Sequence, residues 1–114
     1  MEKKTTILVA DDHPLFRAGV VNFLKERNYI VAGEANDGEE TIELVKNLSP
    51  DILILDMDMP KYNGLQVIER VSEISPETKI IFMTMYKEEK LFKGISRNSA
   101  QEIENKIENK KMGV

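Results

Sequence analysis

The sequence contains no cysteine among its 114 residues. Disulfide bonds, thiolate metal sites and thiol catalysis are therefore excluded. The start of the chain is basic, but the apolar run that follows covers only residues 7–10. That run is too short for a signal-peptide core or a membrane span. We therefore expect a soluble, cytoplasmic protein with no membrane partner.

The sequence also lacks an excess of positive charge. Its 16 basic and 20 acidic side chains give a formal net charge of −4. Nucleic-acid binding favours a basic patch, and the mildly basic segment 87–114 is better explained as a solvated helix. We expect no direct nucleic-acid binding by this chain. Without internal repeats or low-complexity linkers, the length corresponds to one domain over residues 1–114.

Apolar strand-like runs alternate with segments of helical periodicity. Runs such as 6–10, 51–55 and 79–83 are continuously apolar or nearly so, which indicates strands buried on both faces of a parallel sheet. A further strand is expected over 29–35. Repeated βα units imply right-handed crossovers and helices on both faces of the sheet.

Three helices are predicted from apolar side chains at helical spacing. The first begins near His13-Pro14, the second covers 39–48, and the third follows the loop 60–64. Their expected inward-facing residues are Phe16, Val20, Phe23 and Leu24 in the first, Ile42, Val45 and Leu48 in the second, and Leu65, Ile68, Val71 and Ile74 in the third.

Polar side chains follow three of the apolar runs. Asp11 and Asp12 follow the first, Asp56 and Asp58 follow the run 51–55, and Thr84 ends the run that starts at Lys79. In a parallel sheet the ligand site lies beyond the carboxyl ends of the strands. These side chains are therefore expected to converge on a site for a hard cation and a phosphoryl group.

Three segments, 9–20, 55–64 and 81–86, resemble the receiver domain of response regulators in two-component systems, of the NarL/FixJ/LuxR type. Their order and separation are also similar to that family. The resemblance implies a flavodoxin-like α/β fold, a doubly wound parallel sheet with strand order 2-1-3-4-5. It implies a conformational switch for a downstream, transcriptional output rather than an enzyme, although such a domain assists its own phosphorylation and dephosphorylation.

The resemblance also implies roles for individual residues. Asp56 is the expected phosphoacceptor for a sensor histidine kinase. Asp11, Asp12, Asp56 and the backbone carbonyl of Asp58 are the expected Mg²⁺ ligands, and Thr84 is the expected switch hydroxyl. Carboxylate and carbonyl oxygens are the ligands that Mg²⁺ prefers.

The sequence departs from the family near its end. Receivers carry a lysine at the end of strand five, and the corresponding segment here is 94–97, with Arg97 or Lys93 as the candidate cation for the phosphoryl group. The stretch from Thr84 to Arg97 is short for a loop, a helix, a turn and a strand, which need on the order of 20 residues. Helix four and strand five are therefore expected to be shortened. The shortening is an internal deletion, a gap closed by renumbering, or a native feature.

Several alternatives stay open at this point. A damaged strand five favours a pseudo-receiver that binds but does not switch, and it leaves strand four as an edge able to pair in a homodimer. The segment Asp56-Met57-Asp58 also resembles the Asp-x-Asp motif of HAD-like phosphatases, although the chain is short for that family. His13 is expected at the surface or as a helix cap, and Ser99 is expected to cap the last helix. The chain stops where a linker to a DNA-binding output domain begins in the family, so no output domain is expected in it.

Overall fold

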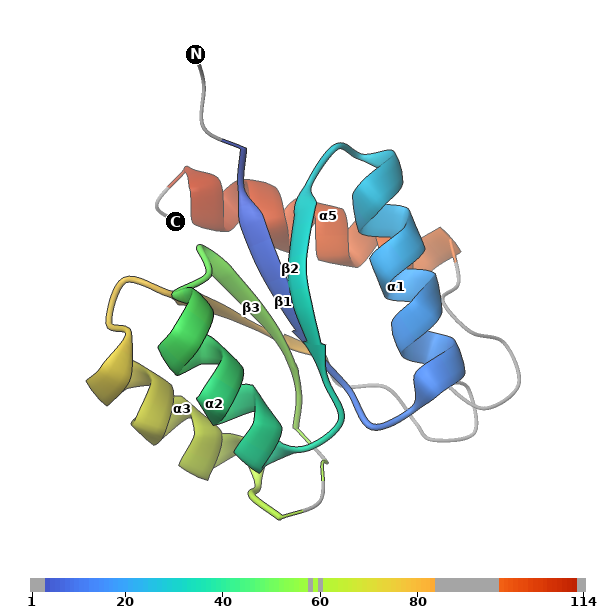
Figure 1. Cartoon of the computed structure of the whole chain (residues 1–114). Coiled ribbons are helices and arrows are strands. Elements are labelled where there is room, and N and C mark those ends of the chain that lie inside the picture. Colours follow the sequence, from blue (N-terminus) through green and yellow to red (C-terminus); the bar gives the residue numbers. More distant parts are fainter. Residues whose placement is uncertain (1–3, 58, 60, 84–96, 113–114) are drawn as a thin grey trace.

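The computed structural model of the chain describes residues 4–57, 59, 61–83 and 97–112, without the side chains of 97–99. Strands and helices alternate along it (Figure 1). In chain order the elements are β1 (Thr6–Ala10), α1 (Pro14–Glu26), β2 (Ile30–Ala35), α2 (Gly38–Leu48), β3 (Ile52–Asp56), α3 (Gly64–Ile74), β4 (Lys79–Met83) and α5 (Arg97–Lys111).

The four strands form one parallel sheet in the order β2-β1-β3-β4. This order confirms the first four positions of the expected 2-1-3-4-5 arrangement. Of the segment 94–97, where the fifth strand was expected, residues 94–96 lie outside the described residues. Arg97 is the first residue of α5, so it does not end a strand.

Helices cover both faces of the sheet, as in a doubly wound α/β fold (Figure 1). One core cluster joins α1 and α5 to alternate residues of the strands, including Val9, Ile54 and Ile81. The other joins α2 and α3 to the intervening residues, including Leu8 and Leu55. Because β1 and β3 are buried on both faces, their residues 7–10 and 52–55 are continuously apolar.

The helix starts follow from local side-chain chemistry. Pro14 occupies the first turn of α1, where its missing N–H costs nothing. Asp37 caps α2 by accepting a hydrogen bond from the Glu40 N–H at 2.8 Å. Asn63 and Gln66 form a reciprocal capping box at the start of α3, with distances of 2.9 and 3.0 Å. These caps fix α2 and α3 at the same edge of the sheet, close to the acidic residues.

Three of the expected helix positions were wrong. Leu65 is 67% exposed, because α3 buries Val67 together with the expected Val71, and Leu65 lies about 200° around the helix from Val67. Leu48, in the last turn of α2, is 42% exposed. The last helix begins at Arg97 and therefore includes Ser99, which does not stand at its N-cap.

Within the described part of the chain, we find no helix long and apolar enough to cross a membrane.

Candidate metal and phosphoryl site

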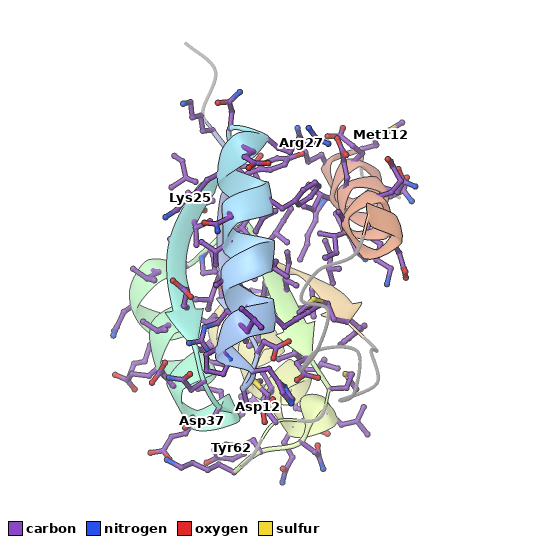
Figure 2. The ribbon with its side chains drawn as sticks, turned by 90° about the vertical axis from the view of Figure 1, so that its right-hand side faces the viewer. Asp12, Lys25, Arg27, Asp37, Tyr62 and Met112 are labelled. Atoms are coloured by element: carbon purple, nitrogen blue, oxygen red, sulfur yellow. The ribbon has the colours of Figure 1, made fainter. Side chains whose placement is uncertain are left out.

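Three carboxylates meet at the carboxyl edge of the sheet. Asp56 is the last residue of β3, and Asp11 and Asp12 directly follow β1. Asp11 and Asp56 are almost completely buried, and a quarter of the Asp12 side chain is exposed. One ligand atom from each of these residues and from His13 lies within 4.8 Å of the others. Figure 2 shows Asp12 at one end of the molecule, with Arg27 at the opposite end.

The backbone at Asp11 is fixed by strand pairing and by a side chain of α1. The Asp11 N–H donates to the Ala35 carbonyl at 3.0 Å, which extends the β1–β2 ladder. The Arg17 guanidinium donates from Nη1 to the Asp11 carbonyl and to Asn36 Oδ1, both at 2.6 Å, and from Nε to Glu34 Oε1 at 3.0 Å. Arg17 therefore ties the loop after β1 to the end of β2.

His13 faces the site. It stands at the N-cap of α1 but makes no side-chain cap hydrogen bond, and only 13% of its side chain is exposed. Its Nδ1 lies 2.9 Å from Asp12 Oδ1 and 3.3 Å from Asp11 Oδ1. His13 therefore has the expected N-cap position, but its side chain neither caps the helix nor lies at the surface, because the imidazole contacts the carboxylates.

Burial and the neighbouring carboxylates disfavour ionisation of Asp12. Burial raises the pKa of Asp12, the neighbouring His13 opposes this, and a hydrogen bond to Asp56 with the charges of Asp56 and Asp11 raises it further. A bound divalent cation counters this repulsion, since it favours the ionised carboxylates. The oxygen-rich donor set and its unfavourable charge therefore fit a hard cation such as Mg²⁺.

Two glycines allow the loop between β3 and α3 to pack closely beside the site. A Cβ at Gly64 would lie 2.5 Å from Met57 Sδ, and one at Gly38 would lie 2.5 Å from the Cβ of Tyr62. Lys61, in the same loop, has a left-handed backbone with φ 75°, and its Nζ lies 3.5 Å from Asp37 Oδ2. The loop is therefore held against the start of α2.

The structure brings together Asp11, Asp12 and Asp56 of the expected site residues. Asp58, Thr84 and Lys93 lie outside the described residues. The backbone of Arg97 lies in α5, and its side chain is outside the described part. Sequence reasoning missed the contacts of Arg17 and the contact of the His13 imidazole with the carboxylates. A sequence signal for both was their position within the first turns after the acidic pair.

Comparisons with known proteins agree with this fold. The family model of the response regulator receiver domain matches residues 7–111. The chain therefore belongs to the receiver domain family of response regulators.

Its relatives are receivers of the NarL type. The nitrate/nitrite response regulator protein NarL of Escherichia coli (strain K12) is 46% identical over 66 residues, which are 57% of this chain and 31% of that protein. The matched segment thus spans about a third of that relative.

Two solved structures are similar over most of the chain. The signal receiver domain of the response regulator NarL from Mycobacterium tuberculosis has a TM-score of 0.70 and 34% identity, and the match covers 89% of this chain and 78% of that one. The REC domain of AraT, a response regulator from Geobacillus stearothermophilus, has a TM-score of 0.79 and 27% identity, with 97% and 98% covered.

Proposed function

We propose that this chain is a receiver unit over residues 1–114 that accepts a phosphoryl group on Asp56 from a sensor histidine kinase, in a Mg²⁺-dependent reaction in the cytoplasm. The phosphorylated state then acts as a conformational switch for a transcriptional output. One observation carries the proposal: the Asp56 carboxyl lies buried at the carboxyl end of β3, within 4.8 Å of ligand atoms of Asp11 and Asp12.

Asp56 is the nucleophile of the proposed reaction. A carboxylate oxygen of Asp56 forms a bond to the incoming phosphorus, while the bond from phosphorus to the donor nitrogen breaks. The donor imidazole keeps the electron pair of that bond and is protonated. The product is an acyl phosphate, and hydrolysis later returns the free carboxylate. The chain thus assists its own phosphorylation and dephosphorylation without turning over a separate substrate.

Asp11 and Asp12 would hold the metal together with Asp56 and the backbone carbonyl of Asp58. Mg²⁺ held by these residues would supply charge neutralisation for the transferring phosphoryl group. Asp11 is positioned by the β1–β2 ladder and by Arg17, so its carboxylate needs little reorganisation.

The remaining roles concern side chains outside the described part of the chain. We propose that the Thr84 hydroxyl hydrogen-bonds the phosphoryl group and thereby couples phosphorylation to the conformational change. Arg97 or Lys93 stays the predicted cation for the phosphoryl oxygens. Arginine differs from lysine in reach and planarity, so the two candidates predict different efficiencies of phosphorylation.

Intact mass after incubation with acetyl phosphate and Mg²⁺ tests the proposal. We expect one phosphoryl adduct that requires Mg²⁺ and is lost in Asp56→Asn. Asp51→Asn is the matched control, because Asp51 Oδ2 accepts hydrogen bonds from Thr6 at the opposite end of β3 and the variant should still be labelled. An adduct that survives Asp56→Asn would contradict the proposal. A folded protein that binds Mg²⁺ but gains no adduct would indicate a pseudo-receiver.

A further inference from the structure

The phosphoacceptor function proposed above assigns no role to the imidazole of His13. That imidazole is mostly buried, with 13% of the side chain exposed, and it faces the acidic pair. Its Nδ1 lies 3.3 Å from Asp11 Oδ1 in a hydrogen bond and 2.9 Å from Asp12 Oδ1 in an ion-pair contact. The side chain makes no cap hydrogen bond to α1, so helix capping does not explain this placement.

These two distances indicate which ring nitrogen carries the proton. An ionised carboxylate only accepts hydrogen bonds, and a neutral imidazole has one nitrogen that donates and one that accepts. With its proton on Nε2, the ring would direct the lone pair of Nδ1 at acceptor oxygens 2.9 and 3.3 Å away. A proton on Nδ1 makes both contacts attractive instead. Nδ1 is therefore a hydrogen-bond donor to Asp11.

The backbone of His13 supplies a second donor to the same oxygen. The His13 N–H donates to Asp11 Oδ1 at 2.8 Å. The residue is itself held by α1, because the Arg17 N–H donates to the His13 carbonyl at 2.9 Å. Two donors of one residue therefore converge on Asp11 Oδ1. Together they restrict rotation of this carboxylate about its Cβ–Cγ bond, while the same ring lies against the carboxylate of Asp12.

We propose that His13 is a positioning residue of the cation site: its Nδ1–H holds the carboxylates of Asp11 and Asp12 in the orientation that receives Mg²⁺, and the ring does not contact the ion. The inference rests on the proposed function, because it concerns the same site. A group that hydrogen-bonds a metal-ligating side chain fixes its orientation, and losing such a group weakens metal binding by roughly 10- to 100-fold. His13 thus acts on the Asp11 carboxylate, as Arg17 acts on the backbone carbonyl of the same residue.

The first test detects the ring proton in the metal-free chain. The chain contains one histidine, so nuclear magnetic resonance of the full chain, with histidine labelled with the heavy nitrogen isotope, reports Nδ1 and Nε2 of His13 alone. At neutral pH we expect the chemical shift of a protonated nitrogen at Nδ1, both before and after Mg²⁺ is added. A proton on Nε2 alone, or loss of the Nδ1 proton when Mg²⁺ is added, would overturn the inference.

The second test measures the Mg²⁺ affinity of variants by isothermal titration calorimetry. His13→Ala removes the ring donor and should bind Mg²⁺ about tenfold more weakly. His13→Asn keeps an N–H donor at the position of Nδ1 and should stay within about twofold of the unmodified chain. Leu15→Ala is the matched control and should leave the affinity unchanged, because Leu15 lies in the same turn of α1 with 63% of its surface exposed. Unchanged affinity in His13→Ala, or equal losses in His13→Ala and His13→Asn, would refute the positioning role.

Labelling with acetyl phosphate separates this inference from the proposed function. At saturating Mg²⁺ we expect His13→Ala to gain the adduct on Asp56, because excess ion compensates for weaker binding. If His13→Ala binds Mg²⁺ as tightly as the unmodified chain and both are labelled, the proposed function stands and only the role of His13 is overturned. If the unmodified chain neither binds Mg²⁺ nor gains the adduct, the inference and the proposed function both fail.

Discussion

Arg17 is the side chain of α1 that holds the loop beside the acidic site. Its guanidinium holds the Asp11 carbonyl, Asn36 and Glu34 at once, with distances of 2.6 to 3.0 Å. Only 14% of this side chain is exposed, so the three hydrogen bonds are poorly replaced by water. Because Arg17 contacts the backbone carbonyl of Asp11, we assign it a positioning role.

Replacing Arg17 by lysine should weaken Mg²⁺ binding by about fivefold, which corresponds to roughly 1 kcal/mol, because an ammonium group cannot keep all three contacts in a planar fork. Isothermal titration calorimetry measures the effect. Arg70→Lys is the control, since Arg70 lies exposed on α3 and pairs only with Glu73 among the partners described. If the two variants bind Mg²⁺ alike, the positioning role is refuted. The melting temperatures of both variants are measured as well. If the two variants lose the same thermal stability, a difference in their Mg²⁺ affinity is not caused by general destabilisation.

At the scale of single residues, the sequence predicted which side chains meet but not what holds them. Asp11, Asp12 and Asp56 were predictable because each follows a strand of a parallel sheet, and strand ends meet at one edge. The contacts of Arg17 were not predictable, because they join α1 to residues that follow or end β2. Such contacts depend on how the helix sits on the sheet, which periodicity does not determine.

At the scale of the helices and strands, the capping box of α3 is formed by residues that are close together in the sequence. Replacing Asn63 by alanine removes the acceptor of the Gln66 N–H and should lower the free energy of unfolding by about 1 kcal/mol. Urea denaturation measures the change. Asn47→Ala on the exposed side of α2 is the matched control and should stay within about 0.5 kcal/mol of the unmodified chain. Equal midpoints for the two variants would show that the cap contributes nothing to stability.

Attachment of α5 to the start of β2 depends on a tyrosine whose ionisation opposes folding. The Tyr29 hydroxyl donates to Glu108 Oε1 at 3.0 Å, and the Lys111 Nζ lies 5.5 Å from the centre of its ring. Burial, followed by the hydrogen bond to Glu108 and the charge of Glu108, raises the pKa of Tyr29 from 10.0 to about 12. The stability that this group contributes is therefore full below pH 10 and is lost as the pH rises toward 12.

Tyr29→Phe should accordingly reduce the decrease in the free energy of unfolding that occurs in alkaline solution. We expect the unmodified chain to lose on the order of 1 kcal/mol more than the variant between about pH 9 and pH 12, a value reduced for partial solvent screening. Urea unfolding across this range, with Tyr62→Phe as the control for loss of a phenol, measures the difference. Parallel curves for the unmodified chain and Tyr29→Phe would rule out a stabilising role for the contact with Glu108.

Local side-chain chemistry determines where the helices start, whereas packing determines which of their faces are buried. The starts of α1, α2 and α3 were predicted within a residue or so, because Pro14, the turn at Asp37 and the loop before Gly64 act locally. The buried face of α3 was misassigned at Leu65, because several apolar residues lie around the helix and the neighbouring α2 decides which of them is covered. Periodicity therefore identified the helix but not all of its contacts.

At the scale of the whole molecule, two lysines link the edge strand β4 to α5. Among the described residues β4 pairs with β3 alone. The Lys106 Nζ donates to the Phe82 carbonyl at 3.0 Å, and the Lys79 Nζ donates to the Lys110 carbonyl at 2.6 Å. A cavity of about 300 Å³ lies between β4 and α5. Lysines at a strand edge oppose pairing with another chain, because pairing would bury their charge.

Lys106→Leu should therefore strengthen self-association through β4. The substitution removes the donor to the Phe82 carbonyl and places an apolar side chain beside the cavity, which includes Ile80 and Ile81 in its lining. We predict a homodimer that pairs through β4, and we expect its dissociation constant to be lower by at least about threefold in this variant, roughly 0.7 kcal/mol, as measured by sedimentation velocity over a concentration series. Lys25→Leu, on the exposed side of α1, adds the same apolar group away from β4 and is the control. Equal self-association of the two variants would contradict pairing through β4. Stronger self-association of Lys106→Leu alone would place the contact at β4 and show that Lys106 limits the pairing.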